Sequence, residues 1–203
     1  MLQTQTVEPN LLELLRSLMS NEAFADFYLV GGTALALQIG HRKSIDIDLF
    51  GNTELDELSF LEILSNWGKI EILKKSRNIL IYLINGIKLD FVNYRYPWLQ
   101  EPLILEGIRF ASKPDILAMK LNAISGRGSK KDFIDLYFLL KEFSVKEALS
   151  FYNKKYQDGS SFLVRKSLSY FVDADAEPSP LMFNDVSWDE VKSSIRTAII
   201  DLE

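Results

Sequence analysis

Cysteine is absent from the 203 residues, and histidine occurs once, as His41. The absence of cysteine excludes disulfides, thiolate metal sites and cysteine nucleophiles. A single histidine excludes a His-rich zinc site and any mechanism that needs two imidazoles. The chemistry open to this chain is therefore that of carboxylates, lysines, hydroxyl groups and bound ions.

Long hydrophobic runs are also missing. No stretch of about 18 apolar residues occurs, so no membrane-spanning helix and no membrane partner are expected. The first ten residues are polar and acidic and lack a basic segment followed by an apolar one, which argues against a secretory signal. We therefore expect a cytoplasmic protein. Hydrophobic residues make up 47% of the chain, which is too much for a disordered protein.

Charge is spread unevenly along the sequence. Residues 111–170 carry 11 Lys and Arg against 6 Asp and Glu, whereas both flanking sections are acidic and the formal net charge is −5. A basic section can meet phosphates, and an acidic one can hold a divalent cation. Charged helix surfaces are also common in proteins without either function, so this pattern alone leaves both interpretations open.

The hydrophobic pattern predicts an α/β half followed by an all-helical half. Helices are expected at 10–20, 33–39, 53–66, 113–125 and 130–143, with two more beginning after Ser144 and Ser187. Strands are expected at 27–30, 45–50, 69–74, 78–84 and 87–93, with a further strand pair or extended stretch ending at 110. Asn85-Gly86 between two apolar runs indicates a type I′ hairpin. Two prolines and several acids make 173–180 the best candidate for a linker.

Asp46 and Asp48 are two residues apart on a predicted strand. Side chains alternate along a strand, so both carboxylates share one face while Ile45, Ile47 and Leu49 share the other. Two adjacent carboxylates repel each other unless water or a cation lies between them, and Mg²⁺ prefers such oxygen ligands. The pair therefore indicates either a magnesium site or the solvated acids of an edge strand.

Lys88 and Asp90 share a face of the second hairpin strand. A third carboxylate on a neighbouring strand, Asp90, could complete a two-metal site with Asp46 and Asp48 for in-line phosphoryl displacement. The alternative is the exposed face of a two-stranded ribbon.

Gly31, Gly32 and Thr33 stand where a strand becomes a helix. Glycines allow close approach of the backbone, and a helix N-terminus offers N–H groups to an anion such as a nucleoside triphosphate. A plain strand-to-helix turn is the alternative. The residues lack the pattern of a P-loop or of a dinucleotide-binding motif.

Lys120 lies at the edge of an apolar stripe formed by Leu117, Leu121 and Ile124. A lysine in this position needs either an anion, for which a triphosphate is suitable, or a route for its ammonium to solvent. Ser129 and Asp132 have capping-box spacing, as do Thr53 and Asp56, so helix capping is one interpretation of Asp132.

Together these residues resemble a known pattern. Gly-Gly-Thr, twelve residues, Asp46-x-Asp48 and then Asp90 is similar to the polymerase-β-type nucleotidyltransferase motif. The stretches Val30-Gly-Gly-Thr-Ala-Leu-Ala-Leu and His41-Arg-Lys-Ser-Ile-Asp-Ile-Asp-Leu-Phe resemble the AbiEii/AbiGii-like nucleotidyltransferases, the toxins of bacterial toxin–antitoxin and abortive-infection systems. The resemblance covers roughly residues 28–140.

The resemblance extends to further motifs. Lys88-x-Asp90 is similar to the second motif of the family, Lys120-x-x-Ala123 to the third, and Arg127 followed by Lys131-Asp132-x-x-Asp135 to the fourth. Asp135 reads more readily as a structural residue, with Arg127 as its partner. His41 is a possible base, although it stands in a polar loop before the aspartate strand.

The resemblance implies an α+β fold, with a polymerase-β-type mixed sheet flanked by helices at 1–112 and a helical domain at 113–203 that contributes Lys120 and Asp132 to the cleft. The expected metal ligands are Asp46, Asp48 and Asp90, and the expected catalytic residues are these three with Lys120 and Asp132. The expected nucleotide-binding residues are Gly31, Gly32, Thr33, Ser44, Lys88 and Arg127.

The implied reaction is Mg²⁺-dependent transfer of NMP from an NTP to an acceptor hydroxyl, with release of pyrophosphate. A tRNA 3′ end is the expected acceptor, and a cognate antitoxin is a possible partner. Two alternatives stay open: an enzyme that transfers NMP to protein, and an inactive member that binds a nucleotide or a partner.

Overall fold

The computed structural model describes residues 1–200, which form two compact units. The first unit comprises Met1–Tyr96 and Pro102–Ala111, and the second comprises Pro97–Glu101 and the chain from Ser112 onward. Within the described residues, no helix is both long and apolar enough to cross a lipid bilayer.

The first unit is built on a mixed β-sheet. Its strands are β1 (Tyr28–Leu29), β2 (Asp46–Gly51), β3 (Ile70–Ser76), β4 (Ile79–Ile84), β5 (Ile87–Asn93), β6 (Leu103–Leu105) and β7 (Ile108–Phe110). Within residues 1–200 they form a seven-stranded sheet in the order β3-β4-β5-β2-β1-β7-β6. Strand β2 runs parallel to β5 and β1 runs parallel to β7, whereas the other neighbours are antiparallel. The expected α+β class is therefore confirmed.

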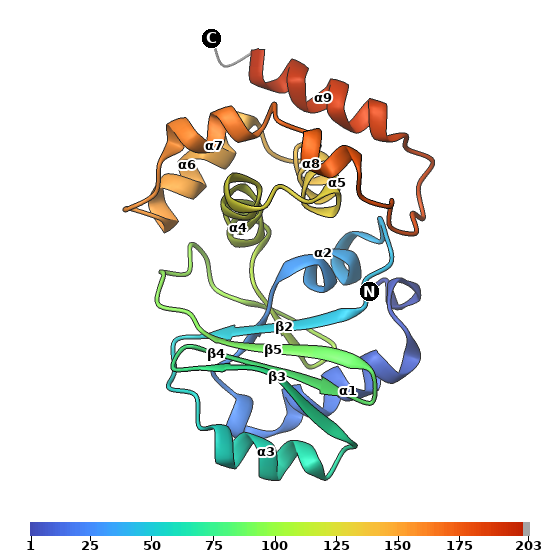
Figure 1. Cartoon of the computed structure of the whole chain (residues 1–203), viewed down its shortest axis with the longest axis vertical. Helices are drawn as coiled ribbons and strands as arrows, with labels where there is room; N and C mark the ends of the chain where they lie inside the picture. Colours follow the sequence, from blue (N-terminus) through green and yellow to red (C-terminus); the bar gives the residue numbers. More distant parts are fainter. Residues whose placement is uncertain (201–203) are drawn as a thin grey trace. The chain divides into compact units, whose positions relative to one another are not determined.

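One face of this sheet forms the core of the first unit. The helical elements here are η1 (Thr4–Thr6), α1 (Pro9–Ser20), η2 (Glu22–Phe24), α2 (Gly31–Ile39) and α3 (Glu57–Ser65). Phe60 of α3 packs on Phe91 of β5 with ring centroids 4.8 Å apart, and Phe24 stacks on Phe91 at 5.1 Å. In Figure 1, α2 and α3 lie on opposite sides of the group of strands β2, β5, β4 and β3. Apolar residues of β2 and β5 lie on the sheet face that α3 covers. Because side chains alternate along a strand, the residues between them point to the opposite face.

The hairpin between β4 and β5 has the turn that its sequence predicts. Asn85 and Gly86 both have positive φ, 49° and 84°, as a type I′ turn requires. This turn fixes the register of the two strands, so that Ile81 pairs with Asp90 and Leu83 with Lys88.

The second unit is helical. It contains α4 (Lys113–Gly126), α5 (Lys130–Leu139), α6 (Val145–Lys155), α7 (Ser161–Ser167), α8 (Val172–Asp175) and α9 (Trp188–Ile200). Helix α4 packs against α5, α6 and α7, and α9 packs against α5, an arrangement that can be followed in Figure 1. Ser112 caps α4 by accepting a hydrogen bond from the Asp115 N–H, and Ser144 with Glu147 forms the predicted capping box of α6.

A buried ion pair attaches residues 97–101 to the second unit. Lys155 Nζ lies 2.7 Å from Asp115 Oδ1, with both side chains fully buried, and donates to the Pro97 carbonyl at 2.8 Å. The same Asp115 oxygen accepts the Leu99 N–H at 2.9 Å. Burial lowers the pKa of Lys155, although the hydrogen bond and charge of Asp115 oppose this shift. No local pattern in the sequence predicts this attachment.

Several local predictions are wrong. Helix α2 begins at Gly31 rather than Thr33, and Asp56 alone caps α3 by accepting the Ser59 N–H, so Thr53 takes no part. The helix expected at 130–143 ends at Leu139, and residues 140–143 form a turn before Ser144, the N-cap of α6. The linker expected at 173–180 is wrong in its first part, because residues 173–175 belong to α8, whereas 176–180 lie outside helices and strands. The whole segment lies inside the second unit.

Candidate active site

Four charged side chains form a block on the two central parallel strands of the first unit. In the register of β2 and β5, Asp46 lies opposite Lys88 and Asp48 lies opposite Asp90. All four are partly exposed, whereas the residues between them, Ile47 and Leu89, are fully buried. The sheet thus places the three predicted carboxylates on one face, opposite the core. We call these four residues the carboxylate block.

The Gly-Gly-Thr turn lies directly against this block. Gly31 has a φ of 69°, and a Cβ atom built there would collide with Asp48 Oδ2. A Cβ at Gly32 would likewise collide with the guanidinium of Arg42. Glycine at both positions therefore lets the start of α2 approach Asp48 and Arg42 closely. The N–H groups at the start of a helix can bind an anion beside these carboxylates.

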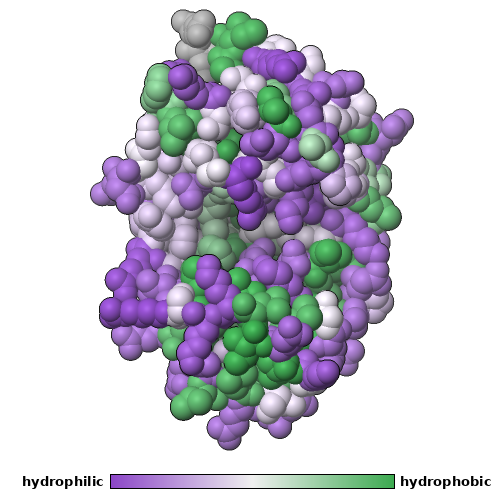
Figure 2. All heavy atoms as spheres, in the orientation of Figure 1, coloured by the Kyte–Doolittle hydropathy of each residue, from purple (hydrophilic) through white to green (hydrophobic). Residues whose placement is uncertain are grey.

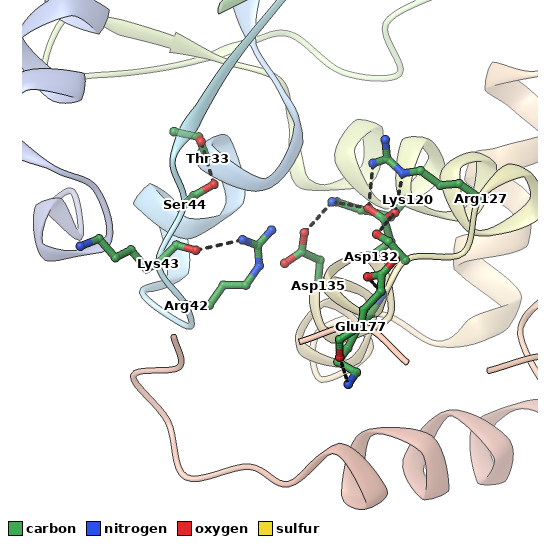
Figure 3. Close-up of polar contacts among 11 residues, drawn as sticks. Thr33, Arg42, Lys43, Ser44, Lys120, Arg127, Asp132, Asp135 and Glu177 are labelled. Carbon is green, nitrogen blue, oxygen red and sulfur yellow. Dashed lines mark hydrogen bonds and ion pairs between the residues drawn. The ribbon is translucent and has the colours of Figure 1, made fainter. Parts of the chain in front are cut away.

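The hydroxyl of Thr33 forms hydrogen bonds with the residues that lead into β2. Its Oγ1 donates to the main-chain carbonyl of Asp46 and lies 2.8 Å from Ser44 Oγ, as Figure 3 shows for the two hydroxyl groups. Thr33 and Ser44 are both buried. These bonds fix the α2 turn to the first residue of β2, so the main chain of the turn is the part best suited to meet a phosphate. Whether Thr33 and Ser44 also contact a nucleotide stays a prediction.

Lys88 and Asp90 form an ion pair along one strand. Lys88 Nζ lies 2.6 Å from Asp90 Oδ1 and 2.7 Å from Oδ2, so the ammonium contacts both carboxylate oxygens. Burial works against the charged form of Lys88. The hydrogen bond and charge of Asp90, with smaller effects of Asp48 and Asp46, outweigh burial and raise the pKa of Lys88. The lysine is thus the cation of an otherwise acidic block.

Two carboxylates of the block are donors of the kind that a hard cation uses. Among residues 1–200, no three His, Asp or Glu side chains are grouped as a metal site. Asp46 and Asp48 nevertheless supply two carboxylates on one strand face, and Mg²⁺ commonly uses one or two carboxylates together with substrate phosphates. These two residues therefore fit a magnesium ion.

An apolar strip borders the carboxylate block. Ile79, Ile81 and Leu83 of β4 are half-buried on the same sheet face, with Ile81 opposite Asp90. Figure 2 shows apolar residues gathered over the strands of the first unit. Such surroundings strengthen electrostatic interactions in the block, because they lower the local dielectric.

The other predicted charged residues belong to the second unit, where they form a cluster around Lys120. Lys120 Nζ lies 2.9 Å from Asp132 Oδ1 and 2.5 Å from Asp135 Oδ2 (Figure 3), and its side chain is only 7% exposed. Two aspartates therefore supply the anion that the buried Lys120 requires. The alternative prediction, that the ammonium of Lys120 reaches solvent, is wrong. A triphosphate as a further partner of Lys120 stays a prediction.

Asp132 is the most heavily bonded member of this cluster. Besides Lys120, it accepts from Arg127 Nε at 2.9 Å and from Ser129 Oγ at 2.6 Å. Burial alone would raise its pKa, but Lys120, Arg127 and Ser129 hold the pKa of Asp132 well below the ordinary value. The capping interpretation of Asp132 is wrong, because its carboxylate bonds side chains rather than the N-cap main chain. Arg127 pairs with Asp132 through its Nε, and its expected pairing with Asp135 stays a prediction.

Two residues before β2 differ from expectation. His41 is fully buried rather than exposed in a polar loop, which disfavours it as a base. Arg42 was not predicted as a site residue, yet its guanidinium lies against Gly32 and is almost fully buried. The only hint in the sequence is its place between the glycine turn and the aspartate strand.

Solved structures share this fold at low sequence identity. JHP933 from Helicobacter pylori matches 95% of this chain and 88% of its own length with a TM-score of 0.61 and 20% identity. The nucleotidyltransferase toxin MenT4 from Mycobacterium tuberculosis H37Rv matches 96% of this chain and 83% of its own length, with a TM-score of 0.56 and 14% identity. The fold is thus one used by nucleotidyltransferase toxins.

Sequence comparison identifies the family. The model of the family "Nucleotidyl transferase AbiEii toxin, Type IV TA system" matches residues 13–198, and the chain belongs to this family. An uncharacterized protein of Aquifex aeolicus (strain VF5), aq_aa25, is 38% identical over 195 residues, which are 92% of this chain and 93% of that protein. The resemblance seen in the motifs is therefore confirmed, and the chain is a nucleotidyltransferase of a type IV toxin–antitoxin system.

Proposed function

We propose that this toxin is a Mg²⁺-dependent enzyme that transfers NMP from an NTP to the 3′ end of a tRNA. The observation that carries the proposal is the carboxylate block, in which Asp46 and Asp48 share a sheet face with Asp90 beside the Gly31 turn. Asp46 and Asp48 would hold Mg²⁺, which when bound supplies positive charge to the phosphates.

The reaction needs little covalent chemistry from the protein. The acceptor oxygen bonds to the α-phosphorus, the bond from that phosphorus to the pyrophosphate oxygen breaks, and pyrophosphate leaves. Main-chain N–H groups at Gly31 and Gly32 would bind phosphate oxygens at the start of α2. Asp90 would take the proton of the acceptor hydroxyl. Positioning and charge stabilisation then account for most of the rate, as in other phosphoryl transfers.

The second unit supports an RNA acceptor. Phe162 of α7 is 70% exposed, and Lys166 Nζ lies 5.4 Å from its ring centroid. Arg165 and Tyr170 are exposed nearby in the sequence. Exposed aromatic rings among basic side chains suit unpaired bases and their phosphates. We call Phe162, Arg165, Lys166 and Tyr170 the α7 surface. This region also lies in the basic section 111–170.

Membership of a toxin–antitoxin family implies two partners, an NTP substrate and an antitoxin. We propose that Lys120, with Arg127, contributes to nucleotide binding in addition to its ion pairs. Lys120 and Arg127 already pair with aspartates, so substituting either can lower the stability of the fold. The effect of each substitution on NTP affinity is therefore measured beside its effect on the free energy of unfolding.

Label transfer tests the proposed function. The protein is incubated with Mg²⁺ and each NTP labelled at the α-phosphate, together with total tRNA and cell protein, and the Asp46→Asn variant serves as control. Label on tRNA that is lost in the variant is expected. Label on protein alone would replace the RNA acceptor by a protein one. No label and no Mg²⁺-dependent NTP binding would identify an inactive member.

A further inference from the structure

Strand β3 is an edge of the sheet. It stands first in the strand order and, within residues 1–200, pairs only with β4. The main-chain N–H and C=O groups on its outer side therefore have no strand partner there and can accept one. A register shift between Ile72 and Lys74 interrupts the pairing with β4, so the regular part after it is Lys74–Ser76. Because this irregularity shortens the regular edge, β3 suits a short extended segment better than a long strand.

The charge of β3 is opposite to that of the sequence around it. Residues 69–77 hold four of the ten Lys and Arg of residues 1–110 but only one of their fourteen Asp and Glu. Three of these cations are exposed and form no ion pair with another residue of 1–200: Lys69, Lys74 and Arg77. Two copies of such a strand repel each other, which disfavours pairing between two molecules of this chain. An acidic segment is attracted to it instead.

A cavity of about 600 Å³ opens at the end of β3. It lies among the β3–β4 turn, the start of α3 and the last residue of β5, and so within the first unit. Its walls include two acids, two bases and two leucines: Glu54, Glu57, Lys75, Arg77, Leu55 and Leu80. Lys75 forms an ion pair with Glu57. Because the acids and bases balance and the leucines offer an apolar wall, the cavity suits an apolar side chain better than a further charge.

The alternation of side chains along β3 separates the charged edge from the cavity. Lys74 pairs with Ile81, on the sheet face of the carboxylate block. Lys75 pairs with the buried Leu80, on the face that α3 covers. A strand added beside Lys74–Ser76 would present alternate residues to these two faces. Residues on one face meet the positive charge of Lys74, and residues on the other meet the cavity.

We propose that β3 is a docking edge for a partner protein: an extended segment that alternates acidic and apolar residues adds as a strand along Lys74–Ser76. Its acidic side chains lie beside Lys74 and Arg77, and an apolar side chain enters the cavity over Leu80. Main-chain hydrogen bonds supply affinity, and the charges and the cavity select the sequence. The inference goes beyond nucleotidyl transfer, since it concerns neither the carboxylate block nor its metal.

Fluorescence anisotropy of a labelled peptide tests the proposal with the full chain. The probe is an octapeptide in which Glu alternates with Val, and neither Mg²⁺ nor NTP is added. The wild type is expected to bind it saturably. Lys74→Glu/Arg77→Glu is expected to weaken binding about tenfold, because two attractive charges become repulsive. Lys146→Glu/Lys154→Glu, which reverses two exposed charges on α6, is the matched control and should change the affinity little. Absence of saturable binding, or equal weakening in both variants, would overturn the proposal.

Two further peptides separate strand addition from simple attraction between charges. The same octapeptide with every main-chain nitrogen methylated keeps its charge but cannot donate strand hydrogen bonds, so it is expected not to bind. A peptide in which Ser replaces Val is expected to bind more weakly, because the cavity no longer receives an apolar side chain. Full affinity of the methylated peptide would contradict strand addition.

Amide hydrogen exchange locates the bound peptide without any substitution. Exchange within Lys74–Ser76 is expected to slow when the octapeptide binds, and protection confined to other segments would overturn the proposal. Oligouridylate serves as a competitor. If it displaces the peptide and itself binds less tightly to Lys74→Glu/Arg77→Glu, the edge is an RNA surface and the proposed partner is wrong. Because none of these measurements needs metal or NTP, failure of the proposed transfer reaction leaves their outcome unchanged.

Discussion

The Asp48 carboxylate lies where a side chain on Gly31 would have to be. An oxygen of Asp48 is within collision distance of the Cβ position of Gly31, whose φ of 69° is itself unfavourable for other residues. The glycine turn and the aspartate strand therefore pack closely, so a larger residue at position 31 would displace the Asp48 side chain.

Substitution of Gly31 by Ala should affect activity more than stability. The added Cβ displaces Asp48, so we expect transfer activity to fall at least about tenfold, with a loss of about 1–2 kcal/mol in the free energy of unfolding from the positive φ. Gly107→Ala is the matched control, since Gly107 has a φ of 80° and no atom within 4 Å of its Cβ position. Equal activity losses in the two variants would rule out the Asp48 contact as the cause.

Removing one carboxylate from β2 should separate function from folding. We expect Asp46→Asn to lose transfer activity about 10²–10³-fold, since metal and phosphate binding are lost. Its melting temperature should stay the same or rise, because repulsion between like charges is relieved. Activity assays and calorimetry, with the exposed Asp26→Asn as control, check this. Chelation by EDTA should abolish activity in the wild type, and added Mg²⁺ should restore it.

The buried Asp132 should make the second unit sensitive to acid. Its pKa is held below the ordinary value of 3.8, so its contribution to stability is present above about pH 4 and is lost as the pH falls toward its folded pKa. Asp132→Asn should cost about 3 kcal/mol at pH 7, because Lys120 and Arg127 lose a partner. Urea unfolding at pH 7, 5 and 3 should show a smaller fall in stability for the variant. Parallel pH profiles would contradict the ion cluster as the cause.

The Lys155–Asp115 pair should behave as a coupled structural unit. Lys155→Met leaves a buried, partly unpaired carboxylate and should cost about 3–5 kcal/mol. Adding Asp115→Leu should cost less than the sum of the two single substitutions, with a coupling energy of about 0.5–3 kcal/mol. Denaturant unfolding of the four proteins in the cycle measures it. Strict additivity would mean that the 2.7 Å contact contributes little.

The α7 surface should set the affinity for RNA without affecting the chemistry. Replacing Arg165 and Lys166 by Ala should weaken tRNA binding and lower the slope of log K against log salt by about 1–2. NTP binding should be unchanged, because neither residue belongs to the carboxylate block. The exposed pair Lys146 and Lys154 on α6 offers a control of equal charge. If both double variants weaken tRNA binding equally, Arg165 and Lys166 contribute to RNA affinity only through net charge.

The sequence predicts best those features that depend on neighbouring residues. Asn85-Gly86 specifies its turn through backbone preference alone, and Ser144 with Glu147 specifies a helix start through bonds three residues apart. The alternation around Asp46 and Asp48 likewise predicts their shared face. These features need no knowledge of distant packing.

Features that depend on distant residues were missed or misassigned. Ser129 and Asp132 have the spacing of a capping box, but the nearby Lys120 ammonium takes the carboxylate instead. The close approach of Gly31 to Asp48 depends on how near the start of α2 lies to the middle of β2, which motif spacing suggests but does not determine.

The attachment of residues 97–101 to the second unit limits how this toxin can be cut into fragments. The chain leaves the first unit after Tyr96, returns to it at Pro102 and leaves again after Ala111, so the two folding units are interlaced along the gene. A fragment beginning at 113 would contain Asp115 and Lys155 without the Pro97 carbonyl and Leu99 N–H that complete their bonding. Neither unit can therefore be obtained intact by a single cut, and a genetic split of this toxin would need to carry the short loop with its C-terminal half.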